Sequence, residues 1–395
     1  MEATFICLNY RSPIGSLGGA LSSFDPVFLS SMLLENFSKI DEIFDMEDVD
    51  HYILGNAIDS NFGPNLINRI VKKSVLPKGI RRTQISQGSI TGLKLLDTAI
   101  QALHNDAHVV LCQSVENMSS IPDYIPNRRL RNGKELKDSV VVSGILRDAY
   151  YIEDHKKIAS SISEQVAEKY SIDRKAMDQW AIRSNQKYDT ALAEGYYKGE
   201  ISPIGFPGNE GQVRVLREDQ EHRKRLSEED ILSLTNTFEK GGNLTDATIA
   251  GSGDGSAIMI IADEKGMRKT GLIPVARILS YNENFYSDDY IECGKQSIEK
   301  ALAKANLNLE DIDLFEIHED TAITPIGIQK ALNIESQKIN QKGGSLAIAN
   351  PISVTGIRLL TTICNQFRNN HKLKYGLVHI SDPSGMSCTV VLENA

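Results

Sequence analysis

The chain has 395 residues, of which 41% are hydrophobic and 24% charged, a balance typical of a folded globular protein with two or three domains. Its net charge of −9 argues against nucleic acid as a main partner, and its apolar runs are too short to span a membrane. The N-terminus does not resemble a secretory signal, and the five scattered cysteines form no CxxC pair. We therefore expect a cytoplasmic protein without a metal centre.

The first 120 residues alternate segments of strand and helix character. Strand-like patterns cover 4–10, 51–58 and 107–115, and helix-like patterns cover 25–38 and 90–106. Strands separated by helices predict a layered α/β domain.

The middle of the chain differs in composition. Residues 121–139 are polar and rich in turn formers, which predicts a surface excursion. Two helices are expected next, the first opened by a capping box of Ser161 and Glu164 and the second capped by Asp173. Four residues of the second helix have the spacing of a core-facing stripe: Met177, Trp180, Ala181 and Ala191.

The last third, from residue 272, again has an α/β pattern. The expected strands cover 275–281, 312–319, 345–350, 375–381 and 388–394. The expected helices cover 294–306, 324–333 and 354–370.

Two stretches in the first and last thirds resemble each other. Residues 89–100 read SITGLKLLDTAI and residues 353–364 read SVTGIRLLTTIC, so six of the twelve positions are identical. The surrounding order of elements also matches, which predicts two copies of one α/β unit. The two equivalent helix N-termini are then expected to face a shared centre.

Ser89 stands at the start of the first of these helices. Nucleophilic side chains often lie on a turn of small residues near the positive end of a helix dipole, and Ser89 has this position. The same position equally suits a helix N-cap.

Several motifs together resemble the thiolase superfamily. They are RSPIGSLGGAL at 11–21, SVENMSSIP at 114–122, the helical segment 166–204, GNLTDATIAGSGDGSA at 242–257 and GGSLAIANPISVTG at 343–356.

The resemblance implies an α/β, thiolase-like fold with two βαβαβαββ halves in a five-layered αβαβα arrangement. The N-terminal half would span 1–120 and be completed by about 245–271, with a loop domain at 121–244 and the C-terminal half at 272–395. It also implies a homodimer or homotetramer that binds coenzyme A esters.

The positions that carry chemistry in this family are substituted here. Ser89 stands where the family has its nucleophilic cysteine, and Asn350 where it has the histidine that activates this cysteine. Ser381 stands where many members have an acid/base cysteine, and Pro383 where a glycine N–H helps to bind the oxyanion. His318 fits a position that the family fills with asparagine or histidine.

These substitutions predict weak or absent ordinary thiolase activity. A serine needs a close general base, and the amide of Asn350 cannot accept a proton near neutral pH. Proline has no N–H, and the loss of one oxyanion donor costs a factor of about 10²–10³ in rate. The chain would then bind acyl-CoA or another acyl ligand without turnover, or serve as the non-catalytic subunit of an active homologue.

A second hypothesis keeps the chain active. In it, Ser89 is the nucleophile of an acyltransferase and His318 is its base, oriented by Glu319 or Asp320. If this is wrong, Ser89 is simply a helix cap and His318 a hydrogen-bonded residue of the cleft.

The resemblance also suggests how coenzyme A would bind, with no other cofactor required. Arg223 stands near the expected nucleotide end, although the basic run 222–225 could equally be a solvated surface. Ala250 and Gly251 belong to the segment that lines the pantetheine arm, and Ala250 replaces a serine there.

Overall fold

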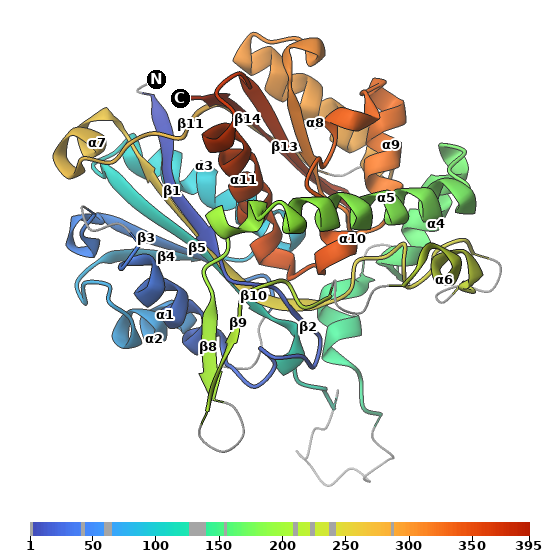
Figure 1. Ribbon diagram of the computed structural model, residues 1–395, viewed down its shortest axis with the longest axis horizontal. Helices are drawn as coiled ribbons and strands as arrows, with labels where there is room; N and C mark the ends of the chain where they lie inside the picture. The colour runs from blue at the N-terminus through green and yellow to red at the C-terminus, as the bar shows by residue number, and fades with distance from the viewer. Residues whose placement is uncertain are drawn as a thin grey trace, which may run out of the picture.

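The computed structural model describes residues 3–40, 44–58, 65–125, 140–153, 156–207, 212–221, 226–236, 242–285 and 288–395. Ten of the described strands form one central sheet, and Figure 1 shows helices on both sides of it. The main path of the sheet runs in the order β12 (Leu314–Ile317), β13 (Tyr375–Asp382), β14 (Met386–Asn394), β11 (Ala276–Asn284), β1 (Thr4–Arg11), β10 (Gly253–Ala262), β5 (Val109–Asn117), β3 (His51–Gly55) and β4 (Arg81–Ile85). The short strand β2 (Gly15–Ser16) pairs with β10.

The sheet has two halves that meet where β1 pairs with β11. Parallel pairs join β3 to β4, β3 to β5 and β12 to β13, while the other pairs are antiparallel. Within each half, helices connect the parallel strands, as parallel pairing requires.

Three hydrophobic clusters define five layers. The first outer cluster packs α1 (Pro26–Phe37) and α2 (Leu66–Lys73) on the N-terminal half, and the second packs α8 (Tyr290–Ala305) and α9 (Ile323–Leu332) on the C-terminal half. The central cluster holds α3 (Thr91–Leu103) and α11 (Ile352–Asn369) between the two halves. Successive side chains of a strand point to opposite faces of the sheet, so each strand can pack against two layers. In β10, Met259 packs in the central cluster, whereas Ile258 and Ile260 pack in an outer one. The expected α/β, thiolase-like fold is confirmed.

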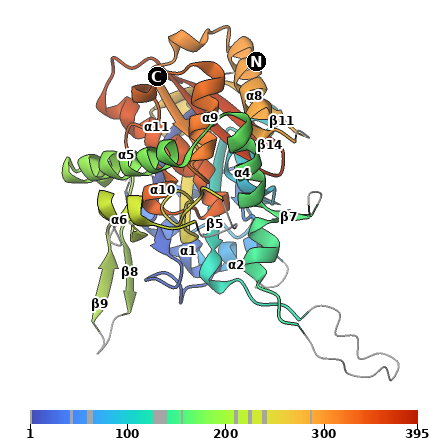
Figure 2. The same cartoon turned by 90° about the vertical axis from the view of Figure 1, so that its right-hand side faces the viewer.

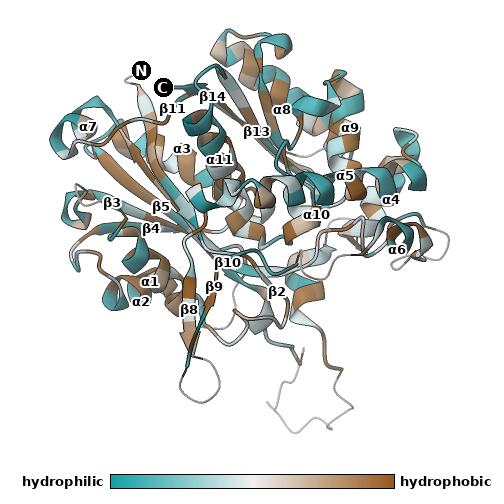
Figure 3. Ribbon diagram, viewed as in Figure 1, coloured by the Kyte–Doolittle hydropathy of each residue, from teal (hydrophilic) through white to brown (hydrophobic). Residues whose placement is uncertain are grey.

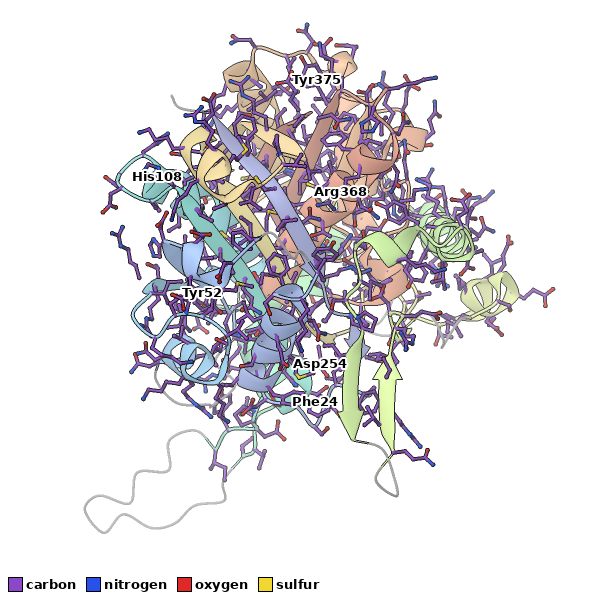
Figure 4. The ribbon with its side chains drawn as sticks, turned by 60° about the vertical axis from the view of Figure 1, so that its left-hand side comes forward. Phe24, Tyr52, His108, Asp254, Arg368 and Tyr375 are labelled. Atoms are coloured by element: carbon purple, nitrogen blue, oxygen red, sulfur yellow. The ribbon has the colours of Figure 1, made fainter. Side chains whose placement is uncertain are left out.

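The two repeated stretches form the starts of α3 and α11, which pack side by side. A Cβ at Gly92 would lie 2.9 Å from the Cα of Gly356, and one at Gly356 would lie 2.9 Å from the Cα of Gly92. These two glycines occupy the same position of the repeat, so the two copies meet backbone to backbone. Arg368, near the end of α11, donates to Asn9 Oδ1 in β1 at 2.7 Å and ties the central layer to the sheet (Figure 4).

The segment between β5 and β10 contains three further α-helices and several short strands among its described residues, and its helix α5 lies across one side of the molecule (Figures 1 and 2). Its elements are β6 (Tyr151–Ile152), β7 (Lys157–Ile158), α4 (Ala159–Lys169), α5 (Arg174–Ala193), β8 (Ile204–Pro207), β9 (Val213–Leu216) and α6 (Glu228–Ser233). Asp173 caps α5 by accepting from Ala176 N at 2.8 Å, and the predicted core stripe of α5 is buried. The domain boundaries proposed from the sequence stay a prediction.

The predicted capping box of Ser161 and Glu164 is wrong. Helix α4 already begins at Ala159, so Ser161 lies inside its first turn. The Glu164 carboxylate instead accepts backbone N–H groups of Asn243 and Leu244, at 2.6 and 2.7 Å, because a distant segment packs against it.

The strand predicted at 345–350 is also wrong, because residues Ser345–Ile348 form the short helix α10. Glu319 accepts from Leu346 N at 3.3 Å, and its carboxylate lies against Gly344, where a Cβ would be 2.2 Å from Oε2. The buried carboxylate thus caps a helical turn at a place where a hydrophobic run alone predicts a strand.

Hydropathy follows this architecture, since the apolar residues concentrate on the strands and on the inner helix faces in Figure 3. One further helix, α7 (Glu264–Thr270), follows β10. Within the described ranges, no helix has the length and apolar character needed to cross a membrane.

Candidate functional site

A cavity of about 620 Å³ lies where the two halves and the inserted segment meet. The N-terminal half contributes residues 57–58 and 88–89, and the C-terminal half contributes 320–321, 350, 352, 382–384 and 386. The inserted segment contributes residues 148–152, 158–160 and 163. Five acidic side chains line the cavity, namely Asp148, Glu221, Asp246, Asp320 and Asp382, and its described lining includes no lysine, arginine or histidine.

Ser89 faces this cavity from the turn that opens α3. The turn is fixed by Thr91, whose Oγ1 accepts from Gln87 N at 2.8 Å and donates to Gly88 O at 2.7 Å. Gly88 has φ +50°, which glycine adopts without strain. A Cβ at this glycine would also lie 3.1 Å from Met386 Cε, so the hairpin of β13 and β14 comes close to the turn.

Asp382, at the end of β13, is the partner of Ser89. Its carboxylate lies close enough to the hydroxyl and the backbone N–H of Ser89 for both groups to lower its pKa, and a Cβ at Gly88 would be 4.0 Å from Asp382 Oδ2. It also accepts from the N–H of Ser384 at 2.8 Å and from the Ser384 hydroxyl. Burial raises the pKa of Asp382, while these four donors act in the opposite direction. A carboxylate therefore occupies the positive end of α3, where a nucleophile or an oxyanion would be stabilised.

Asn350 lies across the cavity just before α11. Its Oδ1 accepts from Thr355 Oγ1 at 2.7 Å, and its backbone N–H donates to Gly251 O at 2.7 Å. The preceding residue, Ala349, has φ 78° and ψ 171°, a conformation that only glycine adopts readily. Asn350 is thus held in place at the cost of local backbone strain.

His318 and Ser381 are placed behind the cavity wall and do not line it. The Nδ1 atom of His318 lies 3.5 Å from Ser345 Oγ, which also accepts from Arg358. Burial, followed by the nearby Arg358, lowers the pKa of His318 to about 3. Ser381 is fully buried, and its Oγ is 2.7 Å from the Nε2 of His379.

The proposed pairing of His318 with Ser89 finds no support in these contacts. Glu319, one of its two suggested orienting groups, accepts from Trp180 Nε1 at 2.9 Å and Ser184 Oγ at 2.8 Å. Its carboxylate thereby joins the C-terminal half to α5. The other group, Asp320, lines the cavity itself.

The predicted coenzyme A residues fall into two groups. Ala250 and Gly251 line the cavity, and Ala250 N donates to Asp320 O at 2.9 Å. Arg223 lies outside the residues that the structure describes, as do its basic neighbours.

The sequence analysis missed Asp382 as a site residue. Its neighbours Ser381 and Pro383 drew attention because they depart from the family motif, whereas an aspartate before Pro-Ser-Gly reads as an ordinary turn residue. Asp382 could have been found from its position, because it follows the candidate site residue Ser381 at the turn between the last two strands.

A duplicated α/β fold encloses this cavity at the starts of two equivalent helices, with polar side chains from both halves facing inward. These features define a protein of the class in which two related halves build one site between them. Residues 4–265 match the thiolase N-terminal domain, and residues 272–394 match the thiolase C-terminal domain. The chain belongs to the thiolase family, which confirms the resemblance inferred from its motifs.

Known relatives and structures are similar over nearly their full length. The chain is 30% identical to a probable acetyl-CoA acetyltransferase of Dictyostelium discoideum, covering 100% of this chain and 94% of the relative. It is also 30% identical to the acetyl-CoA acetyltransferase of Escherichia coli K12, covering 100% and 99%. The crystal structure of the Bacillus anthracis acetyl-CoA acetyltransferase superposes with a TM-score of 0.94 at 26% identity, covering 100% and 99%. Human mitochondrial 3-ketoacyl-CoA thiolase in complex with CoA gives a TM-score of 0.91 at 25% identity, covering 100% and 98%.

Proposed function

We propose that the chain binds an acyl-CoA, or a related acyl thioester, in the cavity beside Ser89 without ordinary thiolase turnover. The family, the relatives named acetyl-CoA acetyltransferases and the solved neighbour with CoA support the choice of ligand. No metal is required for such binding.

One observation carries the proposed loss of turnover, namely the Asp382 carboxylate that lies beside the hydroxyl and N–H of Ser89 in the same cavity wall. A tetrahedral intermediate on Ser89 would need N–H donors for its oxyanion. A carboxylate lies beside the N–H of Ser89, and Pro383 has no N–H to offer. A negatively charged carboxylate also repels a developing oxyanion.

The test is intact-mass spectrometry after incubation with acetyl-CoA, together with calorimetric titration of the same ligand. We expect measurable binding, no acyl adduct and no acetoacetyl-CoA. Ser89→Ala is compared with Ser86→Ala, because Ser86 is an exposed serine of the same turn that does not line the cavity.

An adduct that is lost in Ser89→Ala but kept in Ser86→Ala would contradict the proposal. If Asp382→Asn also removed this adduct, Asp382 would be the general base of an active serine acyltransferase. If only His318→Ala removed it, the pairing of Ser89 with His318 would be the active arrangement.

A role as a subunit is a second proposal, and the exposed edge of the sheet supports it. Among the described strands, β4 ends the sheet and pairs on one side only, with β3. Its five residues are all partly or fully exposed, and a free edge of this kind is a ready site for pairing with another chain. We propose a homodimer or homotetramer, or a complex with a catalytic homologue, and light scattering would distinguish these from a monomer.

We also propose a cytoplasmic location. All five cysteines are free and buried, as suits a reducing compartment. Fractionation of the native cell, with blotting for the chain, tests this.

A further inference from the structure

Asp320 lies next to the Ser89 site and has hydrogen-bonding capacity to spare. Its carboxylate accepts from Thr324 Oγ1 at 2.5 Å and from the backbone N–H of Thr321. A carboxylate has about four acceptor positions, so these donors leave some of them free on the cavity side. The Asp382 carboxylate is near enough to repel Asp320, which places this group close to Ser89.

Two buried hydroxyls belong to the same cluster. Ser163 lines the cavity from α4, and Tyr290 stands at the start of α8 among Ser163, Thr321, Thr324 and Asp320. Both residues are 0% exposed, and within the described part of the chain neither hydroxyl has a hydrogen-bond partner at 3.5 Å or less. The two hydroxyls are therefore neighbours without being bonded to each other.

Such groups are costly in a folded protein. A buried polar group without a partner loses its hydration and gains nothing in return, so most buried polar groups are paired. Here Ser163 and Asp320 line one cavity, and the Tyr290 hydroxyl lies next to them without lining it. A ligand group with polar hydrogens would satisfy Asp320 and Ser163 directly, and its bond to Ser163 would orient that hydroxyl toward the neighbouring Tyr290.

We infer that Asp320, Ser163 and Tyr290 form a subsite for an acyl group that carries a hydroxyl or amino group within its first few carbons. This inference rests on the proposed function, since the acyl group is taken to lie beside Ser89. A hydroxyl or ammonium group would donate to Asp320 and form a hydrogen bond with Ser163, which would orient that hydroxyl toward Tyr290. A plain alkyl chain would leave all three groups unsatisfied, and a second carboxylate would be repelled by Asp320 and Asp382.

The experiment compares matched thioesters by calorimetric titration. The pairs are butyryl-CoA with 3-hydroxybutyryl-CoA and 4-hydroxybutyryl-CoA, and propionyl-CoA with 3-aminopropionyl-CoA. The same acyl groups are also presented as N-acetylcysteamine thioesters, which lack the nucleotide. We expect at least one polar acyl group to bind about tenfold more tightly than its plain partner, as a hydrogen bond to a charged group provides.

Variants assign this preference to residues. Asp320→Ala should abolish it, whereas Asp246→Asn, at an exposed acidic position of the same cavity, should change all affinities alike. Tyr290→Phe should weaken the polar ligand selectively without lowering the Tm, because it removes a hydroxyl that has no partner in the free protein. A hydroxyl with a purely structural role would instead lower the Tm and leave the preference intact.

The outcomes separate this inference from the proposed function. Equal binding of polar and plain acyl groups in both series overturns the subsite, whether or not coenzyme A itself binds. Polar preference in the short thioesters, with no binding of any CoA ester, supports the subsite and overturns the proposed ligand. A preference that survives in Asp320→Ala also overturns the subsite.

Discussion

Replacing Asp320 with asparagine should change how stability depends on pH. Burial, the dominant cause, raises the pKa of Asp320 from 3.8 to about 7, and the Asp382 carboxylate adds to this. Asparagine has the same shape, cannot ionise and still accepts from Thr324. Any difference between the two pH profiles is therefore due to the ionisation at this position.

The magnitude follows from proton linkage. Below pH 3.8 the carboxyl is protonated in both the folded and the unfolded chain, so its stabilising contribution is fully present. As the pH rises toward about 7, only the unfolded chain ionises, and the folded chain loses about 1.4 kcal/mol for each pH unit. Over this range the wild type should lose about 4 kcal/mol more unfolding free energy than Asp320→Asn, and this loss is complete once the pH passes the folded-state pKa.

Urea unfolding of both proteins at intervals from pH 4 to pH 8 tests this expectation. Other buried groups titrate in the same range, such as Glu116, whose pKa burial raises to about 7. These groups are common to both proteins and cancel in the difference. Parallel stability profiles for the two proteins would refute the reasoning, because they would mean that Asp320 is solvated as well in the folded chain as in the unfolded one.

Three further substitutions test other parts of the structure. Asp382→Ala removes the carboxylate beside the turn that opens α3, with its hydrogen bonds from Ser384, and should lower the unfolding free energy by about 1 kcal/mol in thermal denaturation, whereas an unchanged Tm would mean that water replaces it fully. Ala349→Gly should raise the free energy by about 1 kcal/mol in urea, because it relieves the positive φ, and a lower midpoint would contradict the strain. Arg11→Leu leaves the buried carboxylates of Glu200 and Asp219 without their cation and should cost at least about 3 kcal/mol, whereas Arg81→Leu, at an exposed ion pair, should change the stability far less; equal losses in calorimetry would refute the distinction.

Much of the fold could be predicted because the spacing of apolar residues along the chain indicates which segments form strands and which form helices. The alternation of strands and helices at both ends of the chain, and the repeat at 89–100 and 353–364, lead to the observed layers and to the central helix pair. Strand β4 was missed because its residues are mostly polar, whereas α2 was missed although its apolar residues 66, 67, 70 and 71 have helical spacing. The expected strand at 345–350 fails because a carboxylate from a distant segment caps a helical turn there.

The candidate site was less predictable for a physical reason. The sequence could locate Ser89 from the small-residue turn that precedes a helix, and Asn350 from the resemblance of its motif to the thiolase family. It could not show that Asp382 would contact Ser89, since a hairpin almost 300 positions further along the chain brings them together. Nor could it show that Ser163 and Tyr290 would be left without partners, because satisfaction of a hydroxyl depends on neighbours from three separate elements.

The contact between Gly92 and Gly356 has a consequence for how such a chain can change over generations. The two halves are joined there by main chain alone, at residues that face neither the cavity nor a ligand. Selection can therefore act on two nearly separate sets of positions, one that maintains the architecture and one that determines the chemistry. Residues of the cavity wall, such as those at positions 89 and 350, can change without disturbing the junction of the halves. The architecture can thus outlast one reaction and remain available for another role.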